Sequence, residues 1–132
     1  FNLSTDSGSN YNVTKTSTNF RAYHNEADTD TSLTYDTSHD LAQSTAFQSF
    51  GDTSTGNGAD ESLSGLMQLF NPASTTYVKH FIATTQNLLN IDYTVNAFTA
   101  GYGNTTSAIN AIQFKFASGN IADGTILMYG IV

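Results

Sequence analysis

The stretch LSGLMQLFNPASTTYVKHFIAT, residues 63–84, decides the fold class of this chain. Its second half, 76–84, alternates side chains with a period of two, which is the period of a strand and not of a helix. Asn71 and Pro72 interrupt the pattern, because proline cannot donate to a strand ladder and asparagine favours turns. The stretch therefore predicts a β-hairpin formed by strands at 63–70 and 76–84.

Similar alternation predicts further strands on both sides of this hairpin, separated by turns rich in Gly, Asn, Ser and Asp. Together these elements predict one all-β domain over residues 1–132, a two-sheet antiparallel β-sandwich of the jelly-roll-like type. Residues 41–50 fit either a strand or one helical turn. The other expected elements are strands at 1–4, 11–16, 19–23, 31–35, 90–99, 108–116 and 124–132, a loop at 51–58 and a turn at 101–104.

Composition limits the classes of partner. The chain has 132 residues, no cysteine, four Lys and Arg, and a formal net charge of −7. The lack of cysteine excludes disulfides and thiolate metal sites, and the small number of basic residues argues against nucleic acid and anionic membrane surfaces as partners. No apolar run reaches the roughly 18 residues that a membrane span needs. Because the chain starts at Phe1, we expect its natural N-terminus to lie upstream or to be processed.

The last strand, GTILMYGIV at 124–132, is apolar on both of its faces. A strand of this kind is either central in its fold or covered by another subunit. Its place at the end of the chain favours the second interpretation. The residues expected in a subunit interface are Ile126, Leu127, Met128, Tyr129 and Ile131.

Three segments carry a resemblance to a known class of proteins. They are LFNPASTTYVKHFIATT at 69–85, AINAIQFKFASGNIADGTILMYGIV at 108–132 and the turn STDSGSNYN at 4–12. The segment at 108–132 contains the pattern S-G-N-x(3)-G-T-x(3)-Y-G-I, and it resembles the terminal modules of tailed-phage fibre, head-fibre and capsid decoration proteins. The resemblance implies a jelly-roll-like sandwich, often trimeric, on the exterior of a virion.

Acidic residues concentrate between Arg21 and Lys79, where the chain has no other basic residue. On a strand, the alternating His24, Glu26, Asp28 and Asp30 would form a ladder of cation ligands. The simpler interpretation is an exposed acidic loop, so the sequence predicts no metal and no cofactor, with Glu26, Asp28 and Asp30 as weak candidates. The neighbouring Ser, His and Asp at 36–40 predict a polar turn and not a catalytic triad.

Two further positions are possible binding residues. His80 shares a strand face with apolar neighbours, so we expect a core histidine with a hydrogen-bond partner, or alternatively a metal ligand on a trimer axis. Tyr102 and Asn104, in the expected turn GYGN, are candidates for contact with a glycan. The alternative is that Tyr102 only covers the core.

The sequence contains no nucleophile elbow and no phosphate-binding glycine loop. Together with this absence, the resemblance to tailed-phage modules implies a non-enzymatic virion structural protein of a bacteriophage, acting on the virion exterior as a capsid decoration, head-fibre or tail-fibre module. Its partners would be copies of itself, as a homotrimer, or other virion proteins. The alternative is a carbohydrate-binding module of a fibre that recognises a host receptor, or of a secreted bacterial protein.

Overall fold

The structure is a computed structural model that describes residues 1–51, 55, 58 and 60–131. These residues form eight strands and no helix. The expected loop at 51–58 lies largely outside the described residues. The strands are β1 (Asn2–Ser4), β2 (Lys15–Asn25), β3 (Thr31–Tyr35), β4 (Leu41–Ser44), β5 (Leu63–Leu69), β6 (Lys79–Leu88), β7 (Tyr93–Gly103) and β8 (Ala111–Gln113).

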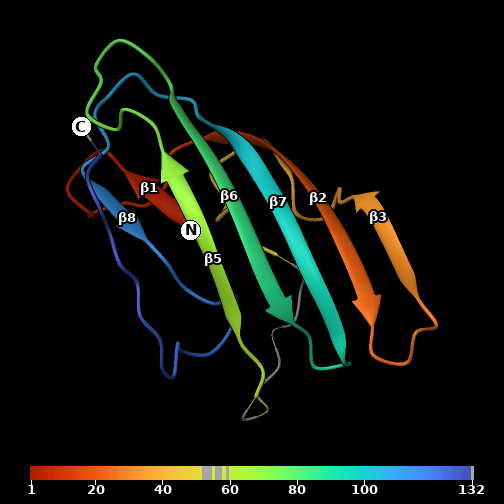
Figure 1. Cartoon of the computed structure of the whole chain (residues 1–132). Helices are drawn as coiled ribbons and strands as arrows, with labels where there is room; N and C mark the ends of the chain where they lie inside the picture. The colour runs from red at the N-terminus through yellow and green to blue at the C-terminus, as the bar shows by residue number, and fades with distance from the viewer. Residues whose placement is uncertain (52–54, 56–57, 59, 132) are drawn as a thin grey trace.

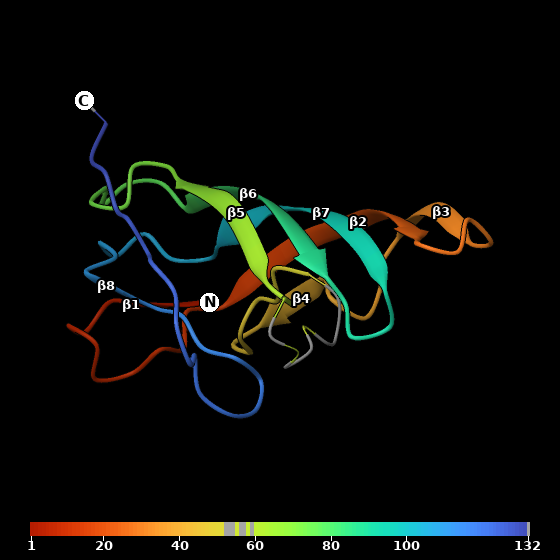
Figure 2. The same ribbon diagram turned by 60° about the horizontal axis from the view of Figure 1, so that its bottom comes forward.

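The strands form two packed antiparallel sheets of unequal size (Figure 1, Figure 2). The large sheet has six strands, in the order β3-β2-β7-β6-β5, and β4 pairs with β2 near its start. Strands β1 and β8 form the small sheet, which lies against one face of the large sheet near one end. The predicted all-β, two-sheet antiparallel sandwich is therefore confirmed.

The hairpin predicted from residues 63–84 is present as β5 and β6, which pair from Leu63 opposite Asn87 to Leu69 opposite Phe81. Asn71 has a φ of 46°, a left-handed conformation that asparagine tolerates better than most residues. The second strand of the hairpin is shifted relative to the predicted range 76–84, because β6 begins at Lys79 and continues to Leu88.

Two predicted turns are absent, because β2 and β7 are longer than expected. The separate strands at 11–16 and 19–23 are replaced by one strand, Lys15–Asn25, and the expected turn at 101–104 is largely the last part of β7. Gly101 is required there by the close approach of β2: a Cβ atom would lie 2.4 Å from the Thr16 carbonyl oxygen. A glycine placed for close packing was thus mistaken for a turn glycine.

An aromatic and aliphatic core joins the two sheets. Phe1, Leu3, Val13 and Phe81 are buried together. The ring of Phe1 stacks on Phe50 with centroids 5.0 Å apart and meets Phe81 edge-on at 5.1 Å. Because these residues come from β1, β6 and two connecting segments, the core fixes the small sheet on the large one.

The inner face of the large sheet also buries two lysines. Lys15 and Lys79 both pair with Gly103, and each is 0% exposed. The Lys15 ammonium donates to Asn2 Oδ1 at 2.5 Å and to the Val13 carbonyl at 2.9 Å. Burial lowers the pKa of Lys15 to about 8, because desolvation disfavours the charged form.

The face of β6 that we expected in the core is the exposed one. His80 and Ile82 point outward, while Lys79 and Phe81 are buried, so the predicted core histidine is wrong. The alternation itself is correct, but the buried side contains a lysine whose ammonium donates to the Tyr77 carbonyl at 2.6 Å. Backbone carbonyls thus make burial of a basic side chain possible on this face.

The C-terminal part of the chain differs most from the prediction. Strand β8 covers only Ala111–Gln113 of the strand expected at 108–116, and Phe116 is 41% exposed. Residues 124–131 form no strand, so the prediction of a strand with both faces buried is wrong for the single chain. The apolar side chains of this segment favour burial. Its backbone, however, pairs with no strand in the described part of the same chain.

Candidate binding surfaces

The C-terminal segment, residues 124–131, exposes a continuous run of apolar side chains. Every residue from 115 to 131 is exposed. Figure 2 shows the chain end projecting away from the sandwich, beyond the end that carries β1 and β8. Isolated exposed apolar residues are normal, whereas a contiguous apolar group marks an interaction site. The five predicted interface residues are Ile126, Leu127, Met128, Tyr129 and Ile131, with exposed fractions between 63% and 87%.

The second surface is the open face of the large sheet, which we define as the outward side chains of β2, β3, β5, β6 and β7. The small sheet covers only the opposite face (Figure 2). Phe20 on β2 pairs with Tyr35 on β3 and with Phe98 on β7. The rings of Phe20 and Phe98 stack with centroids 4.9 Å apart and an interplanar angle of 10°. A band of half-exposed aromatic rings therefore crosses three neighbouring strands.

A shallow hollow continues this band toward the end of β5. Its lining comes from β6, β7 and the residue that follows β5. Ala100 leaves space there because its outward side chain is small. Phe70 adjoins β6 through a hydrogen bond from its N–H to the His80 carbonyl. The residues that line the hollow are Phe70, His80, Phe81, Ile82, Ala100, Gly101 and Tyr102.

Gln43 brings the two predicted glycan-contact residues together. Asn104 Nδ2 donates to Gln43 Oε1 at 2.9 Å, and Gln43 Nε2 donates to Thr16 Oγ1 at 2.7 Å and to the Tyr102 hydroxyl at 3.4 Å. The ring of Tyr102 meets the His80 ring edge-on at 6.3 Å. The arrangement joins an aromatic ring to amide and hydroxyl groups, which is the chemistry that binds sugars.

Sequence reasoning did not identify Gln43. This residue lies within β4 and is distant from Tyr102 in the chain. Its φ of 48° is unusual for a non-glycine residue. This conformation is supported by bonds of both its backbone N–H and its side chain to Thr16 Oγ1. No local sequence pattern could have indicated a pairing that depends on the fold.

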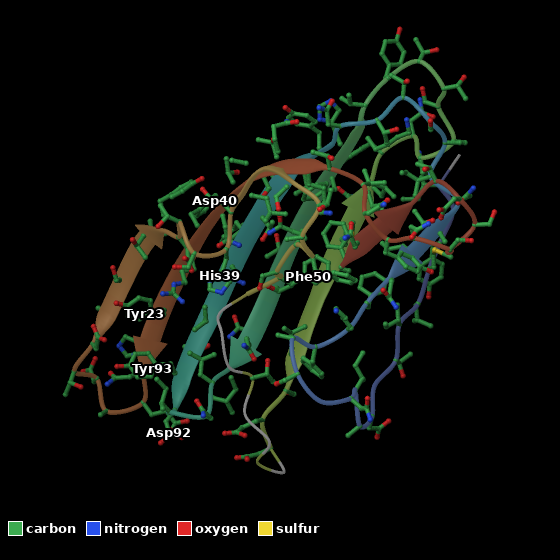
Figure 3. All side chains as sticks on the ribbon, turned by 180° about the vertical axis from the view of Figure 1, so that it is seen from behind. Tyr23, His39, Asp40, Phe50, Asp92 and Tyr93 are labelled. Carbon is green, nitrogen blue, oxygen red and sulfur yellow. The ribbon has the colours of Figure 1, made fainter. Side chains whose placement is uncertain are left out.

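The acidic residues near 24–30 form a turn between β2 and β3 and not a ladder on a strand. His24 Nε2 lies 3.1 Å from Asp28 Oδ1, and the hydroxyl of Tyr93 donates to Asp30 Oδ2 at 3.0 Å. That hydrogen bond to Asp30 raises the pKa of Tyr93. Figure 3 shows Tyr93 beside Tyr23 at this end of the large sheet. Within the described ranges, no group of three or more His, Asp or Glu side chains is arranged to hold a metal ion.

The polar turn at 36–40 is organised around Asp36. Its carboxylate lies 2.7 Å from His39 Nδ1 and 3.4 Å from Arg21 Nε, and it accepts the N–H of Ser38 at 2.9 Å. Burial acts to raise the pKa of Asp36, but these hydrogen bonds and the neighbouring positive charges outweigh it and hold the pKa below its usual value. Figure 3, which views the large sheet from its covered side, shows His39 on that side. The cluster fixes the turn that connects β3 to β4.

No helix that could span a membrane is present in the part of the chain that the structure describes.

Comparison with known proteins adds no family. No family model, curated protein or solved structure matches this chain.

Proposed function

We propose that this chain is a non-enzymatic structural module of a bacteriophage virion exterior, a capsid decoration or fibre module, that assembles with copies of itself through its C-terminal segment. The observation that carries the proposal is the group of five apolar side chains exposed at 126–131. A side chain of this size gains roughly 1.5–3 kcal/mol when it moves from water to a fully buried site. Covering these side chains with another copy would therefore stabilise an assembly.

The remaining surface chemistry agrees with a passive role outside the cell. Charged residues make up 11% of the chain, against about 25% in an average soluble domain. Water hydrates the hydroxyl and amide groups of such a surface. This hydration depends less on the salt concentration than the attraction between charged groups does. The resemblance at 69–85 and 108–132 to tailed-phage fibre and decoration modules supports the same role.

The test is the mass of the protein in solution by light scattering, with and without EDTA. We expect a trimer, because closed rings satisfy a repeated contact between identical chains. We also expect the mass to be indifferent to EDTA, since no cation site is invoked. A single-chain mass of 14.2 kDa at micromolar concentration would contradict the proposal.

A pair of variants locates the contact within the chain. Leu127→Glu combined with Tyr129→Glu places two charges in the apolar group, and we expect it to yield single chains. Ile121→Glu is the matched control, because Ile121 is also exposed in the irregular C-terminal region, at 46%, but lies outside the expected interface. Equal masses for both variants would exclude 126–131 as the contact.

Carbohydrate binding is the second candidate function, as a host-receptor-binding activity of the same module. The observation that favours it is the link of Tyr102 to Asn104 through Gln43. An array of bacterial surface glycans tests it, with Tyr102→Ala expected to lose binding. Tyr77→Ala is the control, since Tyr77 is 69% exposed and sits outside this hydrogen-bonded group. Binding that survives Tyr102→Ala, or no binding to any glycan, would count against this candidate.

A further inference from the structure

We infer that the open face of the large sheet is the surface that receives the C-terminal segment, and that the segment comes from a second copy of this chain. The inference rests on the proposed function, because it names the site at which the proposed assembly occurs. It joins two exposed apolar features of the described chain in one contact.

The receiving surface is apolar across several strands. Its outward residues include the stacked pair Phe20 and Phe98, which are 43% and 37% exposed, and Tyr35 beside them at 50%. Ile82 on β6 is 50% exposed and Leu66 on β5 is 81% exposed. Aromatic rings and branched aliphatic side chains at this exposure are typical of the centre of a protein interface.

The hollow gives this surface a shape that fits a protruding side chain. Its lining includes Ala100, whose side chain is small, and the larger side chains of Phe70, Ile82 and Tyr102. Side chains of the second chain's segment, such as Met128 or Tyr129, are of a size to enter such a space. A side chain packed into a hollow provides the shape complementarity that distinguishes a specific contact from general stickiness.

The absence of charged residues also favours contact between these two surfaces. The chain carries a net charge of −7, so copies repel each other over most of their surface. The outward positions of β2, β3, β5, β6 and β7 contain no Asp, Glu, Lys or Arg, and neither does the segment 124–131. Contact between two uncharged apolar surfaces avoids both like-charge repulsion and the burial of an unpaired charge.

The position of the segment favours a second copy over its own chain. The segment follows β8, and Figure 2 shows its end projecting past the end of the large sheet, away from the sandwich and not folded back over the open face. Its apolar side chains are exposed and therefore do not contact their own open face. A contact between two different surfaces of identical chains is heterologous, and such contacts form a closed ring, as in the trimer of the proposed function, when the rotation between copies closes.

Two kinds of variant separate the two halves of this contact. The segment variant is Leu127→Glu with Tyr129→Glu, and the face variant is Ile82→Glu at the rim of the hollow. Gln86→Glu is the control for the face variant, because Gln86 lies outward on the same strand and outside the hollow. Circular dichroism confirms that each variant keeps its strand content before its mass is measured by light scattering.

We expect both variants to be single chains when alone and Gln86→Glu to keep the wild-type mass. An equimolar mixture of the segment variant and the face variant then gives a species of two chains. In that mixture, the intact segment of one partner meets the intact face of the other and forms one junction. Contact between two segments, or between two faces, could not restore assembly in this way.

The failures can be told apart. A wild-type protein that is a single chain overturns the proposed function and this inference together. A wild-type oligomer whose mass survives Ile82→Glu overturns only the inference, because the segment then docks elsewhere. Should Ile82→Glu lose its strand content, Ala100→Leu replaces it, since a leucine fills the hollow without adding charge; an unchanged mass for that folded variant also overturns the inference.

Discussion

The buried amine of Lys15 gives a stability that changes with pH in a calculable way. The pKa of Lys15 falls from 10.5 to about 8 on folding, because its ammonium is desolvated and bonded only to Asn2 Oδ1 and the Val13 carbonyl. A difference of about 2.5 pH units corresponds to about 3 kcal/mol at 1.36 kcal/mol per unit. Below pH 8 the folded state bears this whole cost, because both states hold the proton.

Above pH 8 the cost disappears as the pH rises. Between pH 8 and 10.5 the unfolded chain binds the extra proton and the folded chain does not, so the free energy of unfolding increases with pH. Lys15→Met removes the titrating group while retaining a buried side chain of similar length. We therefore expect the stability of the wild type, relative to Lys15→Met, to rise by about 3 kcal/mol from pH 7.5 to 10.5.

Urea unfolding of both proteins at several pH values in this interval measures the effect, because the titration of groups that do not interact with Lys15 cancels in the difference. The Phe1 amine does interact with Lys15, but its pKa in the folded protein is lowered to about 5, below this interval. Lys115→Met removes one exposed positive charge and serves as the control for the change in net charge. A wild-type minus Lys15→Met difference that is flat across the interval would show that the Lys15 amine reaches water in the folded protein.

Two further substitutions test the packing, and a third tests the carboxylate of Asp36. Gly101→Ala places a Cβ 2.4 Å from the Thr16 carbonyl oxygen, so we expect a loss of about 1–3 kcal/mol in urea unfolding, whereas Gly130→Ala meets no atom within 4 Å and leaves stability unchanged. Phe81→Ala empties the core beneath the small sheet and should cost about 3–5 kcal/mol; a loss below 1 kcal/mol would mean that the sheets are not packed through this ring. Asp36→Asn removes a carboxylate whose pKa is lowered by folding, so the wild type should exceed the variant in stability above the unfolded pKa near 3.8 and lose that advantage as the pH falls further.

The strands of the large sheet could largely be predicted from local alternation. The hairpin at 63–84 was predictable because its period-two pattern and the Asn71-Pro72 turn act within a few residues. The same pattern could not say which face of β6 is buried, since Lys79 is satisfied by backbone carbonyls that only the fold brings near. Gly101 was misread for a related reason, because the neighbour that requires a glycine there is on β2, far away in the sequence.

The candidate surfaces were predictable in part. The apolar character of 126–131 was visible in the sequence, but the strand expected there needs a backbone partner that the single chain lacks. Tyr102 and Asn104 were identified as neighbours in sequence, whereas Gln43, which joins them, is a neighbour only in space. The open face could not be predicted, because it is defined by which side of the large sheet the short β1 and β8 leave uncovered.

The central claim is that a second copy of this chain covers the exposed C-terminal segment. The most direct measurement is the light-scattering mass of the wild type beside that of the Leu127→Glu, Tyr129→Glu variant at the same micromolar concentration. We predict three times the 14.2 kDa chain mass for the wild type and one chain mass for the variant. A wild type that remains one chain, or a variant that keeps the wild-type mass, would contradict the claim.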